Sequence, residues 1–295
     1  MKISVIVPSY NQGLYLDATL RSILDQSYVG TEVIVKDGGS TDNSVEILRS
    51  FGNRIRWRSA RDRGQTDAIN QGLREATGEI VAYLNSDDVY LPDALTTVAA
   101  YFTAHPECQI LFGDALHLHA DGSVMEPYPT QPWDYNRLFE TCYICQPAAF
   151  WRRSLQARFG YFDETLHYSM DYEFWLRVGA REPLHHLAGW VLAGSRLHGE
   201  TKTLRHRVPF HREILQVIQQ YANRPDQSYG WLKHLASLRA RDDGFHPSAD
   251  PRTHAAHVRQ FCRHVLTYAE QYRIAVDEGL LAELDELLST TSYQP

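Results

Sequence analysis

The sequence is poor in cysteine, and it lacks long apolar runs. Four cysteines in 295 residues are too few for the disulfide framework of a small secreted protein. No stretch approaches the ~20 apolar residues that span a bilayer. The apolar run at the start of the chain ends at Pro8, which makes it too short for a secretory signal. We therefore expect a cytoplasmic protein with reduced thiols and no transmembrane segment.

Basic residues are in the minority. The chain has 29 Lys and Arg against 36 Asp and Glu, which gives a formal net charge of −7. An acidic chain is a poor candidate for binding nucleic acid by bulk electrostatics, so we expect no nucleic-acid partner. The hydrophobic share of 43% is that of an ordinary globular protein, and the length allows one large domain or two smaller ones.

The first part of the chain alternates strand and helix patterns. Short β-branched or apolar runs predict strands at 3–7, 32–36, 55–59, 80–84 and 110–112, and apolar residues recur at helical spacing between them. This series predicts an α/β fold with a mostly parallel, Rossmann-like sheet flanked by helices. In such a sheet ligands bind beyond the carboxyl ends of the strands. None of the turns there has the glycine pattern of a dinucleotide or P-loop site.

The rest of the chain has a different character. It predicts a hairpin turn at Asp121-Gly122, short strands at 148–151 and 187–195, and a short helix at 171–178. Strand signals stop after about residue 204, and three helical faces follow. We therefore expect a helical extension over 204–295, whose purpose the sequence leaves open.

Two acidic features stand where such a sheet places its ligand. Asn85-Ser86-Asp87-Asp88 directly follows an apolar strand, and Asp171 opens an aromatic helix. Acids in such places are often solvated turns, helix caps or partners of the helix dipole. At the carboxyl edge of the sheet they can instead hold a hard cation, which would neutralise a diphosphate.

Four ordered blocks within residues 1–178 together resemble the family 2 glycosyltransferases with the A-type (GT-A) fold. The blocks are Val-Pro-Ser-Tyr-Asn at 7–11 with the helix at 20–28, the segment 32–42, the segment 76–88, and the helix at Asp171. The resemblance implies a GT-A domain over 1–203, with a nucleotide-binding half at 1–114 and an acceptor-binding half at 115–203. Residues 204–295 match nothing general in the family.

The resemblance implies an enzyme that moves a sugar from a nucleotide-diphosphate donor to an acceptor hydroxyl and inverts the anomeric carbon. Asp171 would be the general base. Asp87 would be the main metal ligand, assisted by Asp88, and the cofactor would be Mn²⁺ or Mg²⁺. His198 is a further candidate ligand, since a histidine closes the metal site in some relatives. Lys202 would neutralise phosphate, although both residues can equally belong to a mobile basic loop.

The nucleotide would lie at the ends of the first strands. Tyr10 would lie along the base and Asp37 would accept hydrogen bonds from the base or the ribose. Asp67 and Asn70 begin a helix that faces the same edge, and Asp67 can alternatively be a plain helix-start acid. The remaining predicted donor contacts are Pro8 and Ser9, which would touch the base through their backbone, and Asn11, Asn85 and Ser86.

Three residues depart from the family pattern. Asn85 replaces the usual first Asp of the Asp-x-Asp motif, Met170 replaces a frequent acid, and Gly38 replaces a frequent second Asp. An amide at position 85 can still bind a ribose hydroxyl or a metal-bound water. The departures motivate an alternative function, a catalytically inactive nucleotide-sugar-binding or scaffolding protein. A nucleotidyltransferase is disfavoured, because the loop at 8–13 after the first strand offers little of the glycine- and cation-rich pattern that holds a triphosphate.

The motifs around Asp67, Asp87 and Asp171 resemble a subgroup associated with bacterial surface polysaccharides. We expect the donor of this chain to be a UDP-sugar and the acceptor to be a saccharide or a lipid-linked saccharide. Such an acceptor is compatible with peripheral contact at a membrane. The acidic face of the last helix favours a solvated surface or a homodimer contact over binding to anionic lipid.

Overall fold

The structure, a computed structural model, describes residues 1–242 and 250–290, which form two compact units. The first unit comprises residues 1–133 and 143–201, and the second comprises 134–142 and the chain from residue 202 onward. Residues 134–142 lie within the predicted acceptor-binding half but group with the helical unit. Each unit is described by itself below.

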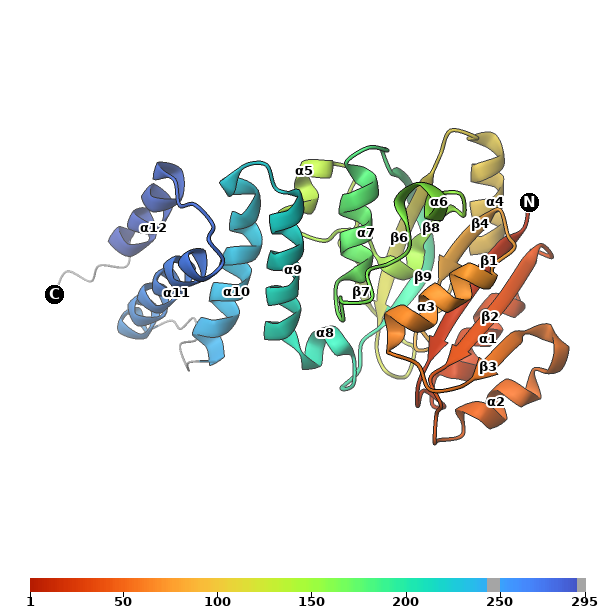
Figure 1. The fold of residues 1–295 in the computed structure, drawn as a ribbon. Coiled ribbons are helices and arrows are strands. Elements are labelled where there is room, and N and C mark those ends of the chain that lie inside the picture. Colours follow the sequence, from red (N-terminus) through yellow and green to blue (C-terminus); the bar gives the residue numbers. More distant parts are fainter. Residues whose placement is uncertain (243–249, 291–295) are drawn as a thin grey trace. The chain divides into compact units, whose positions relative to one another are not determined.

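A nine-stranded sheet forms the centre of the first unit (Figure 1). Its strand order is β3-β2-β1-β4-β8-β6-β9-β5, and β7 pairs with β6. The strands are β1 (Ile3–Ser9), β2 (Thr31–Asp37), β3 (Arg56–Ser59), β4 (Ile80–Tyr83), β5 (Val89–Tyr90), β6 (Ile110–Leu118), β7 (Val124–Pro127), β8 (Ala149–Arg152) and β9 (His185–Arg196).

The direction of the strands brings several carboxyl ends to one edge. β1 to β4 pair in parallel, and β8 runs antiparallel to both β4 and β6. β6 therefore has the same direction as β4, and β9 is parallel to β6. The prediction of a mostly parallel α/β sheet is confirmed, and the antiparallel members are β5, β7 and β8.

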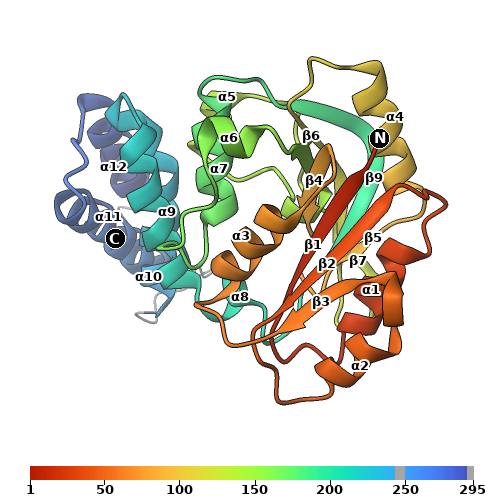
Figure 2. The ribbon, with the colours of Figure 1, turned by 45° about the vertical axis from the view of Figure 1, so that its right-hand side comes forward.

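Helices cover both faces of this sheet, as Figure 2 shows for α3 on one side and α1 and α2 on the other. Val5 and Val7 of β1 share a core with Leu20 of α1, whereas Ile6 faces α3. A Cβ on Gly72 of α3 would lie 2.4 Å from an Ile6 methyl carbon, so only glycine allows this close packing. The helices are α1 (Leu16–Leu24), α2 (Ser44–Ser50), η1 (Gly52–Arg54), α3 (Gln65–Glu75), α4 (Ala94–Ala104), η2 (Gln146–Ala148), α6 (Leu155–Phe159) and α7 (Met170–Gly179).

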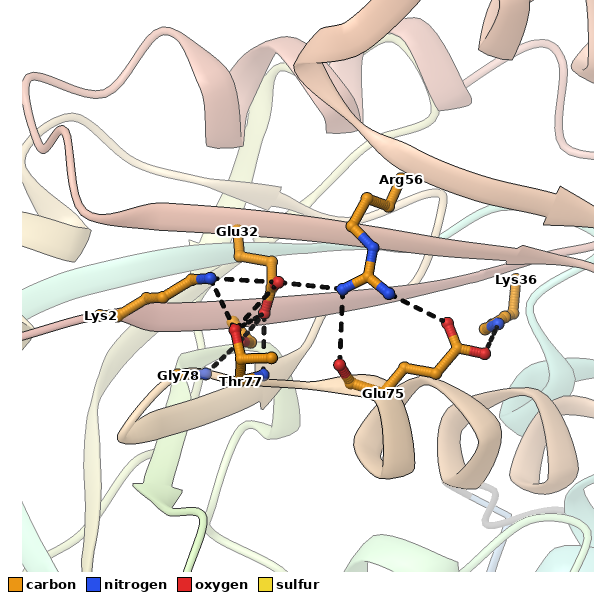
Figure 3. Close-up of polar contacts among 8 residues, drawn as sticks. Lys2, Glu32, Lys36, Arg56, Glu75, Thr77 and Gly78 are labelled. Atoms are coloured by element: carbon orange, nitrogen blue, oxygen red, sulfur yellow. Dashed lines mark hydrogen bonds and ion pairs between the residues drawn. The ribbon is translucent and has the colours of Figure 1, made fainter.

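A polar network ties together the edge of the sheet at which β2 begins (Figure 3). The half-buried carboxylate of Glu32 accepts hydrogen bonds from Ser4 Oγ at 2.5 Å, the Thr77 amide at 3.0 Å and Arg56 at 3.1 Å. The Gly78 amide donates to Ser4 Oγ at 2.9 Å. Gly78 therefore belongs to this network and not to α3, which ends at Glu75 with Ala76 as its C-cap residue.

The second unit is helical, which confirms the predicted character of the carboxyl-terminal region. Its core is formed by apolar side chains such as Ile214, Leu232 and Val265. The Tyr229 hydroxyl donates to the Ala275 carbonyl at 2.8 Å and links α10 to the segment before α12. The sequence analysis did not predict α10. The helices are α5 (Tyr135–Leu138), α8 (Lys202–Arg205), α9 (Arg207–Tyr221), η3 (Pro225–Ser228), α10 (Tyr229–Asp242), α11 (Pro251–Gln271) and α12 (Glu278–Thr290).

Within residues 1–242 and 250–290, no helix is both long enough and apolar enough to cross a membrane.

Candidate functional site

Asp87 and His198 meet at the carboxyl edge of the sheet. Asp87 follows β4 and His198 follows β9, and His198 Nε2 lies 2.9 Å from Asp87 Oδ2. The Thr201 hydroxyl accepts from the His198 amide at 2.9 Å and fixes the turn, and the Tyr15 ring packs 4.7 Å from the imidazole. The His198 side chain is 7% exposed and that of Asp87 is 19% exposed, so the pair is accessible but held in place.

The chemistry of this pair fits a divalent cation. Carboxylate oxygen and imidazole nitrogen are both ligands of Mn²⁺, and Mg²⁺ sites use one or two carboxylates with substrate phosphates and water completing the shell. In the part of the chain that the structure describes, no group of three or more acidic, histidine or cysteine side chains is arranged to hold a metal. A cation at Asp87 and His198 would therefore need oxygens from a bound diphosphate.

Asp88 turns into the protein next to this pair. It is 3% exposed, its Oδ1 accepts from the Arg196 amide at 2.8 Å, and its Oδ2 accepts from Asn85 Nδ2 at 3.1 Å. Burial, with the charge of Asp87 second, raises the pKa of Asp88 well above its ordinary value. Asp88 thus anchors the end of β9 that presents His198, and its predicted role as an assisting ligand stays a prediction.

The Asn85 amide lies at the centre of a small network. Its Nδ2 donates to Asp88 and, at 3.3 Å, to Gln146 Oε1, while its Oδ1 accepts from Gln65 Nε2 at 2.7 Å. An aspartate at this position would lose both donated bonds and bring a second negative charge to Asp88. The departure from the Asp-x-Asp pattern therefore has a physical reason in this chain. Ser86, between Asn85 and Asp87 in the sequence, is 4% exposed, and its predicted contact with the donor stays a prediction.

Asp37, at the end of β2, holds the loop that follows it and bonds the end of β3. Its oxygens accept from Ser40 Oγ and Ser59 Oγ, both at 2.5 Å, and from the amides of Gly39 and Ser40. The side chain is 2% exposed. All the contacts of Asp37 are thus within the protein, and its predicted contact with the base or the ribose stays a prediction.

The residues at the end of β1 are arranged differently from one another. Tyr10 is 61% exposed and is therefore open to stacking on a ligand, whereas Pro8 and Ser9 are buried. The Ser9 carbonyl accepts from the Gly38 amide at 2.8 Å. Asn11 Oδ1 accepts from the Thr41 amide at 2.8 Å, so this side chain bridges the loops after β1 and β2.

α3 holds the segment that leads to Asp171. Thr66 Oγ1 donates to the Leu166 carbonyl at 3.0 Å, and Asn70 bonds both backbone groups of Phe162. Asp67 is 5% exposed and accepts from the Arg63 amide, the Arg63 guanidinium and Gln71, so its contacts are those of a helix-start acid. The predicted contacts of Asp67 and Asn70 with a donor stay predictions.

Asp171 lies in the first turn of α7 and is half-buried. Met170 before it is 4% exposed, which explains why an apolar residue stands where the family often has an acid. α7 packs through Trp175 against Trp151 of β8, with ring centroids 6.0 Å apart, and both tryptophans are core residues. The start of α7 is thereby fixed on a rigid part of the first unit.

Lys202 and Arg196 lie on either side of His198 in the sequence. Lys202 is the first residue of α8 in the second unit, so its predicted phosphate contact stays a prediction. Arg196 was missed by the sequence analysis, although its position at the end of a strand was a usable signal. Its side chain donates to the carbonyls of Asp87 at 2.8 Å and Ala120 at 3.0 Å and so joins the turn after β4 to β9.

Comparison with known proteins identifies the family. The family model described as "Glycosyl transferase family 2" matches residues 4–159, more than half of the chain. The chain belongs to glycosyl transferase family 2. The predicted enzyme class, glycosyltransferase, is confirmed with it.

Curated relatives of this glycosyltransferase include a "PGL/p-HBAD biosynthesis glycosyltransferase" of Mycobacterium bovis (strain BCG / Pasteur 1173P2). The two are 31% identical over 179 residues, which cover 59% of this chain and 68% of the relative. An uncharacterized glycosyltransferase of Nostoc sp. (strain PCC 7120) is 38% identical over 106 residues, covering 35% of this chain and 33% of that one.

Solved structures confirm the GT-A fold. The structure of S. aureus TarS 1–349 in complex with UDP-GlcNAc matches 100% of our chain and 93% of the TarS chain, with a TM-score of 0.66 and 19% identity. The mannosyltransferase PcManGT from Pyrobaculum calidifontis, in complex with GDP-Man and Mn²⁺, matches 100% of this chain and 81% of its own, with a TM-score of 0.60 and 18% identity.

Proposed function

We propose that the protein is an inverting, metal-dependent glycosyltransferase that uses a UDP-sugar in bacterial polysaccharide or glycoconjugate synthesis. The observation that carries this proposal is the Asp87–His198 pair at the carboxyl edge, at 2.9 Å. Two structural neighbours support a nucleotide-diphosphate donor. The TarS complex contains UDP-GlcNAc, and the PcManGT complex contains GDP-Man and Mn²⁺.

Contacts connect this pair to the proposed base. Asn85, in the same turn as Asp87, accepts a hydrogen bond from Gln65 of α3. The next residue of α3, Thr66, donates to the carbonyl of Leu166, which lies five residues before Asp171 in the sequence. A base for inversion must lie within hydrogen-bond reach of the acceptor hydroxyl, on the face of the sugar opposite the leaving group. We assign this role to Asp171, whose segment is fixed by α3 rather than left free.

The reaction can be written with these residues. Asp171 takes the proton of the acceptor hydroxyl while that oxygen forms a bond to C1 of the sugar. The bond from C1 to the diphosphate oxygen breaks, and the nucleoside diphosphate leaves with its electron pair. A cation held by Asp87 and His198 would supply positive charge to this diphosphate.

The acceptor in this proposal is a saccharide or a lipid-linked saccharide. The cytoplasmic location, the peripheral membrane contact and the homodimer stay predictions.

The proposal is tested by Asp171→Asn. The variant should bind UDP with nearly unchanged affinity in the presence of Mn²⁺ and should lose about 10²–10⁴-fold in turnover, the usual contribution of a general base. Mass spectrometry of donor loss and product gain, with a panel of UDP-sugars and saccharide acceptors, measures turnover. Asp93→Asn, at an exposed position with φ of 62° that asparagine tolerates, is the control.

The same assay distinguishes the alternative function. If the wild-type chain binds UDP-sugars but turns over no donor across the acceptor panel, the inactive binding or scaffolding protein replaces the enzyme. If Asp171→Asn retains full turnover, the assignment of the base is wrong.

A further inference from the structure

Residues 202–212, which we call the basic segment, carry positive charge on an acidic chain. The segment comprises α8, His206 and the first turns of α9 (Figure 1). Four of its eleven residues are Lys or Arg and none is Asp or Glu, whereas the whole chain has a net charge of −7. All four side chains are exposed, and they are Lys202, Arg205, Arg207 and Arg212. The basic segment is therefore a local surface that attracts anions.

The two arginines at the start of α9 are not bound by carboxylates of the fold. In the part of the chain that the structure describes, no ion pair joins a carboxylate to Arg207 or Arg212. The buried side chains of α9 begin only at Ile214, so the first turns of this helix lie outside the core of the second unit. Both guanidinium groups are therefore available to an anionic partner.

Apolar side chains lie among these charges. Leu204 of α8 is 47% exposed, and Val208 and Phe210 of α9 are half-buried. Cations interspersed with accessible apolar side chains are typical of helices that lie in a membrane interface, where the cations contact lipid phosphates and the apolar residues enter the acyl boundary. A soluble polyanion would neutralise the same charges but would leave Leu204 in water.

We propose that the basic segment is a docking surface for a membrane that contains anionic lipids. The segment begins four residues after His198 in the sequence, so it directly follows the loop of the proposed donor site. Attachment to a membrane raises the effective concentration of any acceptor that is anchored in the same membrane. This purpose rests on the proposed function, whose acceptor is a saccharide or a lipid-linked saccharide, whereas the binding of lipid does not.

The test is co-sedimentation of the full chain with lipid vesicles, without donor or acceptor. The chain should bind vesicles of phosphatidylcholine and phosphatidylglycerol mixed two to one, should not bind phosphatidylcholine alone, and should be released by high salt. Exchange of both Arg207→Gln and Arg212→Gln should weaken binding about 30-fold, the value expected for two cations at an anionic surface. Exchange of Arg252→Gln and Arg259→Gln, two exposed arginines of α11, is the matched control and should leave binding nearly unchanged.

A further variant distinguishes lipid from a soluble polyanion. Leu204→Ser should weaken vesicle binding about 10-fold, because this side chain no longer enters the acyl boundary. The variant should leave the affinity for heparin, a soluble polyanion, unchanged. Vesicle binding that Leu204→Ser does not alter would overturn the assignment to lipid and leave a surface for any polyanion.

The remaining outcomes separate this surface from the proposed function. Absence of binding to anionic vesicles, or equal binding by the wild type and the variant lacking Arg207 and Arg212, overturns the docking surface and leaves the glycosyltransferase proposal standing. A wild-type dimer in light scattering that this variant converts to a monomer, without vesicle binding by either, assigns the basic segment to a contact between copies instead. Vesicle binding by a chain that transfers no sugar supports the surface and contradicts the proposed function.

Discussion

Asn70 closes a ring of two hydrogen bonds with the backbone of Phe162. The Phe162 amide donates to Asn70 Oδ1 at 3.1 Å, and Asn70 Nδ2 donates to the Phe162 carbonyl at 2.9 Å. Asn70 is 1% exposed and Phe162 is 3% exposed, so water cannot replace these bonds. A side chain of α3 thereby holds the segment that leads to α7 and Asp171.

Asn70→Ala should lower turnover more than it lowers nucleotide affinity. Loss of the ring leaves two buried backbone groups without these partners, which costs about 1–3 kcal/mol per group and loosens the segment before Asp171. Calorimetry with UDP and steady-state kinetics separate the two effects, and Asn53→Ala at an exposed position is the control. A large rise in the Kd for UDP with unchanged kcat would instead support the direct donor contact predicted from the sequence.

Asn85→Asp should destabilise the first unit at pH 7. The change removes the bonds donated to Asp88 and Gln146 and adds a negative charge beside the buried Asp88. We expect a loss of about 1–3 kcal/mol in the free energy of unfolding. The loss should shrink at pH 5, because protonation of one carboxyl removes the repulsion. Thermal melts at both pH values measure it, and an equal loss at both would contradict the electrostatic explanation.

His198→Ala should weaken the binding of Mn²⁺ more than that of Mg²⁺, because imidazole is a better ligand for Mn²⁺. Titration of each ion into the complex with UDP measures both affinities. His119→Ala, at an exposed position before the β6–β7 turn, should leave them unchanged. If His198→Ala binds Mn²⁺ and Mg²⁺ each with the same affinity as the wild type, His198 is not a ligand in the proposed metal site.

Glu32→Gln should change how stability depends on acid. Although burial raises the pKa of Glu32, hydrogen bonds from Ser4, Thr77 and Lys2 lower it from 4.5 to about 2. The folded state therefore favours the ionised carboxylate. Its contribution is full above about pH 4.5 and is lost as the pH falls toward about 2.

Urea unfolding at pH 6, 4.5 and 3 measures this dependence. The slope of stability between pH 4.5 and 3 should be smaller in Glu32→Gln than in the wild type. Glu46→Gln on the exposed face of α2 should retain the wild-type slope. A slope unchanged in Glu32→Gln would show that other carboxyls carry the acid sensitivity.

Local patterns sufficed where burial alone decides the structure. The run of 3–7 predicts β1 because both faces of that strand are covered, and the spacing of Leu16, Leu20 and Ile23 predicts α1 because one face of the helix is buried. α10 was not predicted, and neither was the hydrogen bond from the Gly78 amide to Ser4 across the sheet. Partners that distant in sequence leave no periodic signal.

The candidate site divides in the same way. The family, the parallel sheet and the acids that follow its strands could be predicted from the sequence, because these depend on short blocks with regular spacing. Which of those acids are accessible depends on the contacts made in the folded chain. Asp87 lies next to His198 at this edge and is partly exposed. The carboxylates of Asp37 and Asp88 are buried and accept hydrogen bonds from other parts of the protein. Asp62 lies beside Gly38. Accessibility depends on which donors the fold brings to each carboxylate, and these donors come from strands and loops that are remote in the sequence.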